Sequence, residues 1–201
     1  MTCPPLDCLQ TESREAIMFK DLVLKCRSYR RFHQEEKIEL DTLKELVDLA
    51  RLSASGGNQQ PLKYVLSSDP KKNAVIAPFV GIGGNPPEGE RPSAYIIILG
   101  DKKIREGGFG CDHGIAAQSI MLGATEKGLG GVIVGNVKRD ELRPALSIPE
   151  HLEILLALAI GKPKETAVID SIGQDGVLRG YWDDQKVRHV PKRTLTDIIV
   201  G

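Results

Sequence analysis

The sequence predicts one mixed domain of helices and strands. Apolar runs of strand length occur at 94–99, 131–135 and 152–160, and segments with helical periodicity separate them. From residue 62 onward strands and helices alternate, which is typical of a doubly wound α/β sheet of parallel strands. No repeat or linker divides the 201 residues. We therefore expect a single domain over residues 1–201, in which residues 1–11 form a loose tail.

Bulk properties exclude several classes of protein. The formal net charge is +0 and the pI is about 6.9, which argues against general binding of nucleic acids or anionic membranes. The longest apolar runs are too short to span a bilayer, and no basic region precedes an apolar run near Met1, so we expect no secretory signal. The four cysteines form no C-x-x-C pair and have no histidine at zinc spacing. We expect no metal site, reduced thiols and a cytoplasmic protein.

Local patterns assign the elements in order. Periodicity and capping residues predict helices at 13–26, 43–52, 69–78, 112–127 and 139–146. Strand patterns predict strands at 62–66, 94–99, 131–135 and 152–160, followed by a hairpin over 177–190 and a closing helix led by Thr194 or Thr196. Thr42 with Glu45 fits a capping box, and Asp112 fits a helix cap. Small residues on the 112–127 helix predict a close approach of another helix.

Two breaker loops separate these elements. Residues 53–61 contain Gly56 and Gly57, which permit positive φ, and directed polar groups at Asn58 and Gln60. Residues 81–92 are rich in glycine and proline and have no periodicity, so they predict an irregular loop.

The stretch RSYRRF at 27–32 concentrates three arginines and a serine. Arginine offers a planar fork of donors that matches phosphate oxygens, and serine adds a hydroxyl donor. Such a cluster taken alone is more often a solvated basic turn after a helix.

Sequence motifs of common enzyme classes are missing. The chain has no G-x-x-x-x-G-K-[ST], H-E-x-x-H or G-x-S-x-G, and Gly81-Ile82-Gly83 does not continue as G-x-G-x-x-G. Its four histidines are scattered, and no local acid–base pair stands out. If the protein is an enzyme, a cofactor is expected to perform the chemistry.

Four stretches resemble a known family. RSYRRF at 27–32 and SGGNQQP at 55–61 resemble the N-terminal motifs of the FMN-dependent nitroreductase superfamily. Residues 112–130 resemble its central helix, and AIGKP at 159–163 resembles its late strand. The resemblance runs from about residue 20 to the C-terminus. It implies an α+β, nitroreductase-like fold with a mainly antiparallel sheet flanked by helices, in an intertwined homodimer. This expectation replaces the parallel sheet.

The resemblance also implies a flavin site. Arg27 and Ser28 would hold phosphate or ribityl oxygens, and Arg30 would lie near the pyrimidine edge of the ring. Lys192 and Arg193 would reach the phosphate, although simple solubility explains this pair equally well. The Ser55–Asn58 loop would close over the flavin of the partner subunit, and the 133–135 backbone would pass flavin N5. The implied cofactor-binding residues are Arg27, Ser28, Tyr29, Arg30, Ala54, Ser55, Gly56, Asn58, Gln60, Ile133, Val134, Gly135, Lys192 and Arg193.

The implied function is an FMN-dependent oxidoreductase. It would pass hydride from NADH or NADPH through flavin N5 to a small electron-poor acceptor such as a nitroaromatic or quinone, without a catalytic side chain or metal. Alternatives are a specialised relative, such as a dehalogenase, a flavin-consuming enzyme or a ring dehydrogenase, and a non-catalytic flavin-binding redox sensor. A lower alternative is a nucleotide-binding module that uses the 27–31 cluster for another phosphate ligand.

Two positions depart from the family pattern. Cys26 stands where relatives often have a further arginine, and Ala54 stands where many have proline. The 81–92 loop offers no match to flavin contacts. We expect Arg31 on the surface and Phe32 as an apolar anchor for the stretch.

Overall fold

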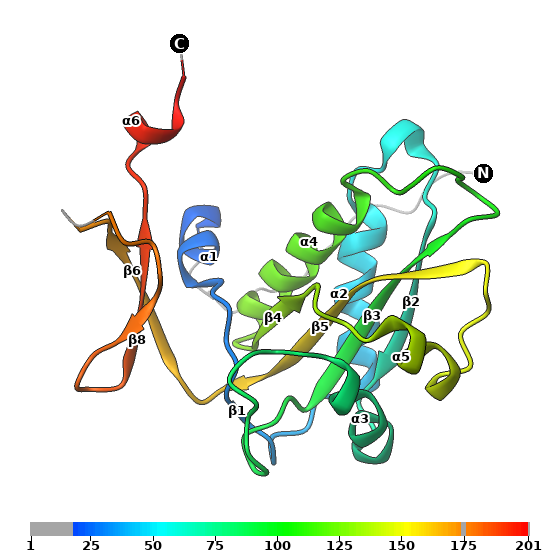
Figure 1. The fold of residues 1–201 in the computed structure, drawn as a ribbon, viewed down its shortest axis with the longest axis horizontal. Coiled ribbons are helices and arrows are strands. Elements are labelled where there is room, and N and C mark those ends of the chain that lie inside the picture. Colours follow the sequence, from blue (N-terminus) through cyan, green and yellow to red (C-terminus); the bar gives the residue numbers. More distant parts are fainter. Residues whose placement is uncertain (1–17, 174–175, 201) are drawn as a thin grey trace, which may run out of the picture.

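The computed structural model describes residues 18–173 and 176–200 and shows a sheet with helices on both faces (Figure 1). The helices are α1 (Phe19–Lys25), α2 (Leu40–Leu52), α3 (Pro70–Ile76), α4 (Asp112–Glu126), α5 (Arg139–Ala145) and α6 (Leu195–Ile198), with short 3-10 turns η1 (Gly56–Asn58) and η2 (Ala77–Phe79). The strands are β1 (Phe32–His33), β2 (Leu62–Ser67), β3 (Ala94–Asp101), β4 (Gly130–Val134), β5 (Leu152–Pro163), β6 (Thr166–Ser171), β7 (Tyr181–Trp182) and β8 (Val187–Lys192).

The main sheet is antiparallel throughout. β3 pairs with β2 and with β5, β5 pairs with β4 along its other edge, and β1 pairs with the last two residues of β5. The parallel sheet predicted from the strand–helix alternation is therefore wrong, and the mainly antiparallel α+β architecture is confirmed.

The reason lies in β5. β3 and β4 run parallel to one another because α4 crosses over between them, as the alternation suggested. However, the later strand β5 inserts between them and pairs antiparallel with both. The order of strands and helices along the sequence was predicted correctly. No local sequence pattern indicates that β5 inserts between β3 and β4.

The core consists of two layers, one on each face of the sheet. Along β3, Tyr95, Ile97 and Leu99 face the layer that contains α5, whereas Ile96 and Ile98 face the layer under α2 and α4. This alternation follows the two-residue period of a strand. Because both faces are covered, all eight residues of β3 are buried, which explains why the segment reads as continuously apolar.

Helices α2 and α4 pack closely because of a small residue. A Cβ added at Gly123 would stand 2.3 Å from Leu49 Cδ1 and 3.1 Å from Leu46 Cδ2. The prediction of a close helix approach over α4 is confirmed, and a larger side chain at position 123 would force the helices apart.

A second, smaller sheet forms near the C-terminus. β8 pairs parallel with β6 and antiparallel with β7, so the predicted hairpin is confirmed in part. The strand β6 has no counterpart in the sequence prediction. In Figure 1 this sheet stands to one side of the main sheet, beside α1.

Helix starts differ from several of the predictions. The predicted start at Ser13 lies outside the described residues. Helix α2 begins after Glu39 without a side-chain cap, so the Thr42–Glu45 capping box is wrong. Thr194 does cap α6, in a capping box with Asp197. Asp112 is the first residue of α4, after an N-cap at Cys111, and its carboxylate binds a loop instead.

No helix in the described part of the chain is long and apolar enough to cross a membrane.

Candidate functional site

A basic cavity lies where α1 leads into the main sheet. Its volume is about 190 Å³, and it is enclosed by the 26–30 stretch, α4, β4 and β8. Four cationic side chains line it, and none of its lining residues within the described ranges is acidic: Arg27, Arg30, Arg188 and Lys192. We call it the basic cavity. Its composition suits an anion.

The 27–31 stretch is held along the edge of β4 by its backbone. Ser28 forms a parallel bridge with Gly131, and the Tyr29 N–H donates to the Gly131 carbonyl at 2.9 Å. Glu165 Oε1 accepts the N–H groups of both Arg30 and Arg31. Because the main chain is fixed in this way, the side chains of Arg27 and Arg30 are available to the cavity.

Arg27 has an unused donor. Its Nη2 donates to the Val23 carbonyl at 2.5 Å, but its Nε is buried and has no hydrogen-bond partner within the described residues. A buried unpaired donor is costly, and the cost is higher for a charged group. An acceptor in the cavity, such as a phosphate oxygen, would pair with this donor.

Two further guanidinium groups converge on one carbonyl. Arg30 and Arg188 both donate to the Ser28 carbonyl, at 3.3 and 3.2 Å. Two cations gathered on one oxygen repel each other, and an anion in the cavity would relieve this repulsion.

Apolar groups form the rest of the cavity wall. Ile133 lies on β4 between Val132 and Val134, which are buried in the core, but its own side chain is 40% exposed. It lines the cavity opposite Gln118 and Met121 of α4. The cavity thus combines an anionic subsite with an apolar surface.

The structure brings some predicted residues together here and leaves others apart. Arg27, Ser28, Arg30, Ile133 and Lys192 all line the basic cavity. Four others from the same stretches of the chain do not.

Val134 points into the core, Arg193 is exposed outside the cavity, and the Tyr29 side chain packs against Gly130. Burial raises the pKa of Tyr29, although nearby Arg27 lowers it in part. At most the backbone of Tyr29 and Val134 can serve a ligand here. Gly135 is exposed just after β4, and its carbonyl accepts from Arg139 at 3.3 Å.

The predicted loop residues form a second group. Ala54, Ser55 and Gln60 line a separate cavity of about 150 Å³ with Asp112 and Tyr64. Burial raises the pKa of Tyr64 to about 12. This cavity borders α4 at Asp112 and Ala116, whereas the basic cavity borders it at Gln118 and Met121. With 3.6 residues per turn, these two pairs lie on opposite sides of the helix. One chain therefore carries two separate groups of the predicted residues.

Asp112 fastens the loop to α4. It accepts the Ser55 hydroxyl at 2.6 Å and the Gly56 N–H at 3.0 Å, with Arg105 nearby at 3.9 Å. Burial alone would raise the pKa of Asp112, but these hydrogen bonds and Arg105 outweigh it and lower the pKa below its ordinary value. The carboxylate is therefore held ionised.

The loop that follows adopts an uncommon backbone. Gly57 has a φ of 59°, in the left-handed region that glycine readily adopts. Asn58 and Gln60 also have positive φ, of 55° and 52°. Gly56 and Asn58 are exposed there. Left-handed residues other than glycine are costly and cluster at functional loops.

Sequence reasoning missed three contributors. Arg188 was overlooked because the predicted hairpin ended at residue 190, whereas β8 continues to Lys192. Alternate residues of a strand share a face, so Arg188, Val190 and Lys192 all line the cavity. Glu165 lies in a turn and carries no motif. Arg31, expected on the surface, is partly buried and pairs with Glu90 at 3.2 Å. Phe32 is fully buried, as predicted.

The chain is similar to known proteins of one family. A model of the nitroreductase family matches residues 23–84 and 90–162. A curated protein of Archaeoglobus fulgidus, proposed by its name to be an NADH dehydrogenase/NAD(P)H nitroreductase, is 26% identical over 163 residues, which is 76% of this chain and 92% of the relative.

Solved structures share the fold. A nitroreductase family protein of Clostridium difficile 630 superimposes with a TM-score of 0.64 at 26% identity, covering 74% of this chain and 86% of that one. A protein of Exiguobacterium sibiricum 255-15, solved in complex with FMN, has a TM-score of 0.66 at 20% identity, covering 75% and 90%.

Proposed function

We propose that this chain, which belongs to the nitroreductase family, is an FMN-dependent oxidoreductase that uses NADH or NADPH to reduce small electron-poor acceptors such as nitroaromatics or quinones. The observation that carries the proposal is the basic cavity with the buried, unpaired Nε of Arg27. The names of the relatives support it, since they include an NAD(P)H nitroreductase and a protein solved with FMN.

The residues present fit FMN. Its phosphate dianion would be held by Arg27, Arg188 and Lys192, which together outweigh its charge. Ser28 and Gln118 would offer donors to the ribityl hydroxyls, and Ile133 would offer an apolar contact to the ring. Bound FMN supplies hydride-transfer chemistry that no side chain of this site provides.

The protein's own contribution is positioning and electrostatics. Arg30 would place a positive charge beside the cofactor ring, where it favours the more negative reduced state. Asp112 holds the 55–60 loop against α4 through Ser55 and Gly56, and the loop in turn can restrict water over a neighbouring ring. No proton transfer needs to be assigned to a side chain of the described residues.

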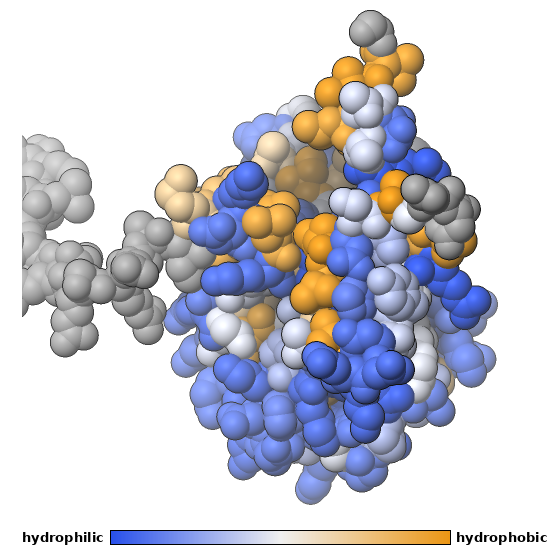
Figure 2. All heavy atoms as spheres, turned by 90° about the vertical axis from the view of Figure 1, so that its left-hand side faces the viewer, coloured by the Kyte–Doolittle hydropathy of each residue, from blue (hydrophilic) through white to orange (hydrophobic). Residues whose placement is uncertain are grey.

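The active form that we propose is a homodimer. Within one chain the loop residues and the basic cavity stay apart, so a complete site requires the loop of a second copy. Figure 2 shows hydrophobic side chains along the face that carries the C-terminal segment, and exposed apolar residues there include Phe19 and Leu24 of α1 and Leu195 and Ile198 of α6. Large exposed apolar surfaces usually mark interfaces.

The test is optical and redox. The purified full chain, incubated with FMN and freed of excess, is expected to retain flavin absorbance. Anaerobic NADH or NADPH should bleach it, and a nitroaromatic or benzoquinone should restore it. Protein that stays colourless after incubation would refute the proposal. Retained flavin without turnover of any acceptor would instead favour a non-catalytic flavin-binding protein.

A further inference from the structure

A cluster of hydrogen-bonded side chains lies on the small C-terminal sheet, on the far side of β8 from the basic cavity. Arg188 and Lys192 line the cavity, so the alternation of a strand places His189 on the opposite face. There the imidazole ring meets one residue from β6, one from β7 and one from the turn after β7: Asp170, Tyr181 and Asp183. We call these four residues the His189 cluster. The family model matches residues up to 162, so the cluster lies outside the matched part of the chain.

Both ring nitrogens of His189 face a carboxylate. Nδ1 lies 2.5 Å from Asp170 Oδ2, and Nε2 lies 3.0 Å from Asp183 Oδ2. A neutral imidazole carries a single N–H, so its bare nitrogen would face the lone pairs of a carboxylate oxygen. The imidazolium donates to both carboxylates. The geometry therefore selects the charged ring, and the hydrogen bonds with Asp183 and Asp170 raise the pKa of His189.

Tyr181 completes the cluster. Its ring stacks on the imidazole with the centroids 4.8 Å apart and the planes 6° apart, and its hydroxyl donates to Asp170 Oδ2 at 3.1 Å. Asp170, Asp183 and Tyr181 are the titratable groups that face His189 from its neighbouring elements within the described residues. One imidazolium thus joins β6, β7 and the turn that leads into β8.

The small sheet depends on such side-chain contacts because it has little core of its own. All residues of its three strands are described, and among them only Pro191 is buried. Strand β7 has two residues, both exposed. A few short strands without an apolar face are marginally stable. Loss of the contacts of His189 is therefore expected to loosen β8.

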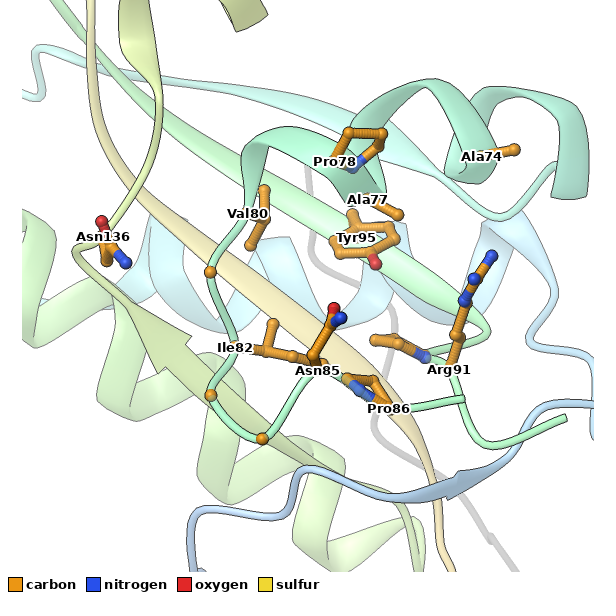
Figure 3. A pocket seen from close by; sticks show the side chains of 14 residues that line it. Ala74, Ala77, Pro78, Val80, Ile82, Asn85, Pro86, Arg91, Tyr95 and Asn136 are labelled. Atoms are coloured by element: carbon orange, nitrogen blue, oxygen red, sulfur yellow. The ribbon is translucent and has the colours of Figure 1, made fainter. Parts of the chain in front are cut away.

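The two guanidinium groups that meet at the Ser28 carbonyl have different supports. Arg30 packs against the main domain, since a Cβ at Gly83 would stand 3.2 Å from Arg30 Nε. Gly83 lies between Ile82 and Asn85 in a loop that borders a separate cavity of about 450 Å³ (Figure 3). The position of Arg30 is therefore independent of the small sheet.

Arg188 is supported by the small sheet. Its backbone pairs with Ala167 of β6 and with Trp182 of β7. The segment before β7 also packs on it, because a Cβ at Gly180 would stand 3.8 Å from Arg188 Nε and 2.9 Å from the His189 carbonyl oxygen. The contacts of His189 with β6 and β7 therefore act on the strand segment that carries Arg188.

We propose that His189 is a positioning residue: its imidazolium fixes β8 between β6 and β7 and so keeps the Arg188 guanidinium at the anion subsite of the basic cavity. Loss of the ring proton leaves one carboxylate without its donor and loosens β8. The inference rests on the proposed function, because the anion that we assign to this cavity is the phosphate of FMN. It adds that FMN binding weakens in alkali, when the ring becomes neutral.

The experiment is fluorescence titration of FMN with the flavin-free full chain between about pH 7 and 9.5, where a phosphate monoester stays a dianion. This range lies above the ordinary histidine pKa of about 6.5, as the raised pKa of His189 requires. The dissociation constant of the wild type should rise about tenfold, near the lower end of the cost of one charge-assisted hydrogen bond.

Two glutamine variants test whether the ring of His189 is responsible. His189→Gln should bind FMN weakly at every pH in this range and show no further rise of the dissociation constant. His33→Gln makes the same exchange at an imidazole that is 42% exposed and pairs with Glu35 alone among the described residues. It should keep the pH dependence of the wild type.

An isosteric variant separates the hydrogen bonds from the bulk of the cluster. In Asp183→Asn, Oδ1 can still accept the N–H groups of Gln185 and Val187, which Asp183 Oδ1 accepts at 2.9 and 2.8 Å. The new amide nitrogen can donate to the bare Nε2 of a neutral ring, whose Nδ1–H donates to Asp170. The neutral ring is then fully paired, so the alkaline rise should disappear.

Arg188→Gln separates positioning from a charge that acts through space. Without Arg188 the residue through which His189 acts is missing, so the rise should shrink to within about twofold. A rise that persists in Arg188→Gln, a rise that survives Asp183→Asn, or a wild-type dissociation constant that stays flat over this range would each overturn the proposal.

The one tryptophan of the chain supplies a readout without flavin. Trp182 pairs with Arg188 between β7 and β8, so its fluorescence in the flavin-free wild type should change over the same pH range, but not in Asp183→Asn. Failure of the wild type to bind FMN at any pH would refute the proposed function. An unchanged Trp182 signal in the wild type would overturn the positioning role of His189.

Discussion

The sharpest prediction concerns which tail arginine holds the cofactor phosphate. Sequence resemblance suggested the Lys192–Arg193 pair, but β8 turns residues 188, 190 and 192 toward the basic cavity. Arg188 also donates to the Ser28 carbonyl at 3.2 Å, which fixes its guanidinium beside Arg30. We expect Arg188, and not Arg193, to contact the phosphate.

The magnitude follows from the contact that is lost. Arg188→Gln removes one of the four positive charges in the cavity and one charge-assisted hydrogen bond, which contributes about 1.5–3 kcal/mol. The dissociation constant for FMN should therefore rise roughly 12- to 140-fold. Arg193→Gln makes the same change in net charge at an exposed position outside the cavity, so its effect should stay within a few-fold.

The assay is titration of FMN fluorescence with flavin-free protein at low and high salt. For Arg188→Gln the difference from the wild type should persist at high salt, because a contact in a partly buried cavity is weakly screened. Any effect of Arg193→Gln should fade. If Arg193→Gln weakened FMN binding as much as Arg188→Gln, the register of β8 would not determine the site and the reasoning would be refuted.

Two further predictions concern the C-terminal sheet and the assembly. His189 is held by Asp170 at 2.5 Å and Asp183 at 3.0 Å, and these hydrogen bonds raise its pKa, so the stabilisation is complete below the unfolded pKa of about 6.5 and is lost as pH rises through the raised value. The melting temperature of His189→Gln should therefore fall furthest below that of the wild type in mild acid. A difference in melting temperature that does not shrink in alkali would contradict the stabilising role of the His189 contacts with Asp170 and Asp183. Sedimentation of the full chain should give twice the 21.9 kDa chain mass, and Ile198→Asp should lower both dimer content and FMN retention. A wild-type monomer that retains FMN would contradict the shared site.

Local sequence signals predicted most of the elements but not their pairing. The central strands β3 and β5 are apolar on both faces, which is the usual pattern of parallel sheets, and helices cover both faces here as well. Only the insertion of β5 between β3 and β4 makes the sheet antiparallel, and no local pattern reports a contact between residues 132 and 159. The family motifs supplied what periodicity lacked.

The candidate site was predictable where it lies in one contiguous motif. Arg27, Ser28 and Arg30 come from a single stretch and do line the cavity. Arg188 and Glu165 are brought there by tertiary structure from the C-terminal part of the chain. The cap predicted at Asp112 failed because its carboxylate finds better partners in the Ser55 loop than in its own helix.

Glu165 gives the site a property that mutation can exploit. Its carboxylate accepts hydrogen bonds from the main-chain N–H groups of residues 30 and 31. These bonds do not involve the side chain at position 30, so we expect the backbone of the 27–31 stretch to keep its conformation when that side chain is replaced. Among the described residues, the Arg30 side chain makes one hydrogen bond, of 3.3 Å to the Ser28 carbonyl. Position 30 is thus a point where the charge beside the proposed cofactor site can be altered while the backbone of the 27–31 stretch stays in place. A family with one fold can in this way diversify its redox behaviour one residue at a time.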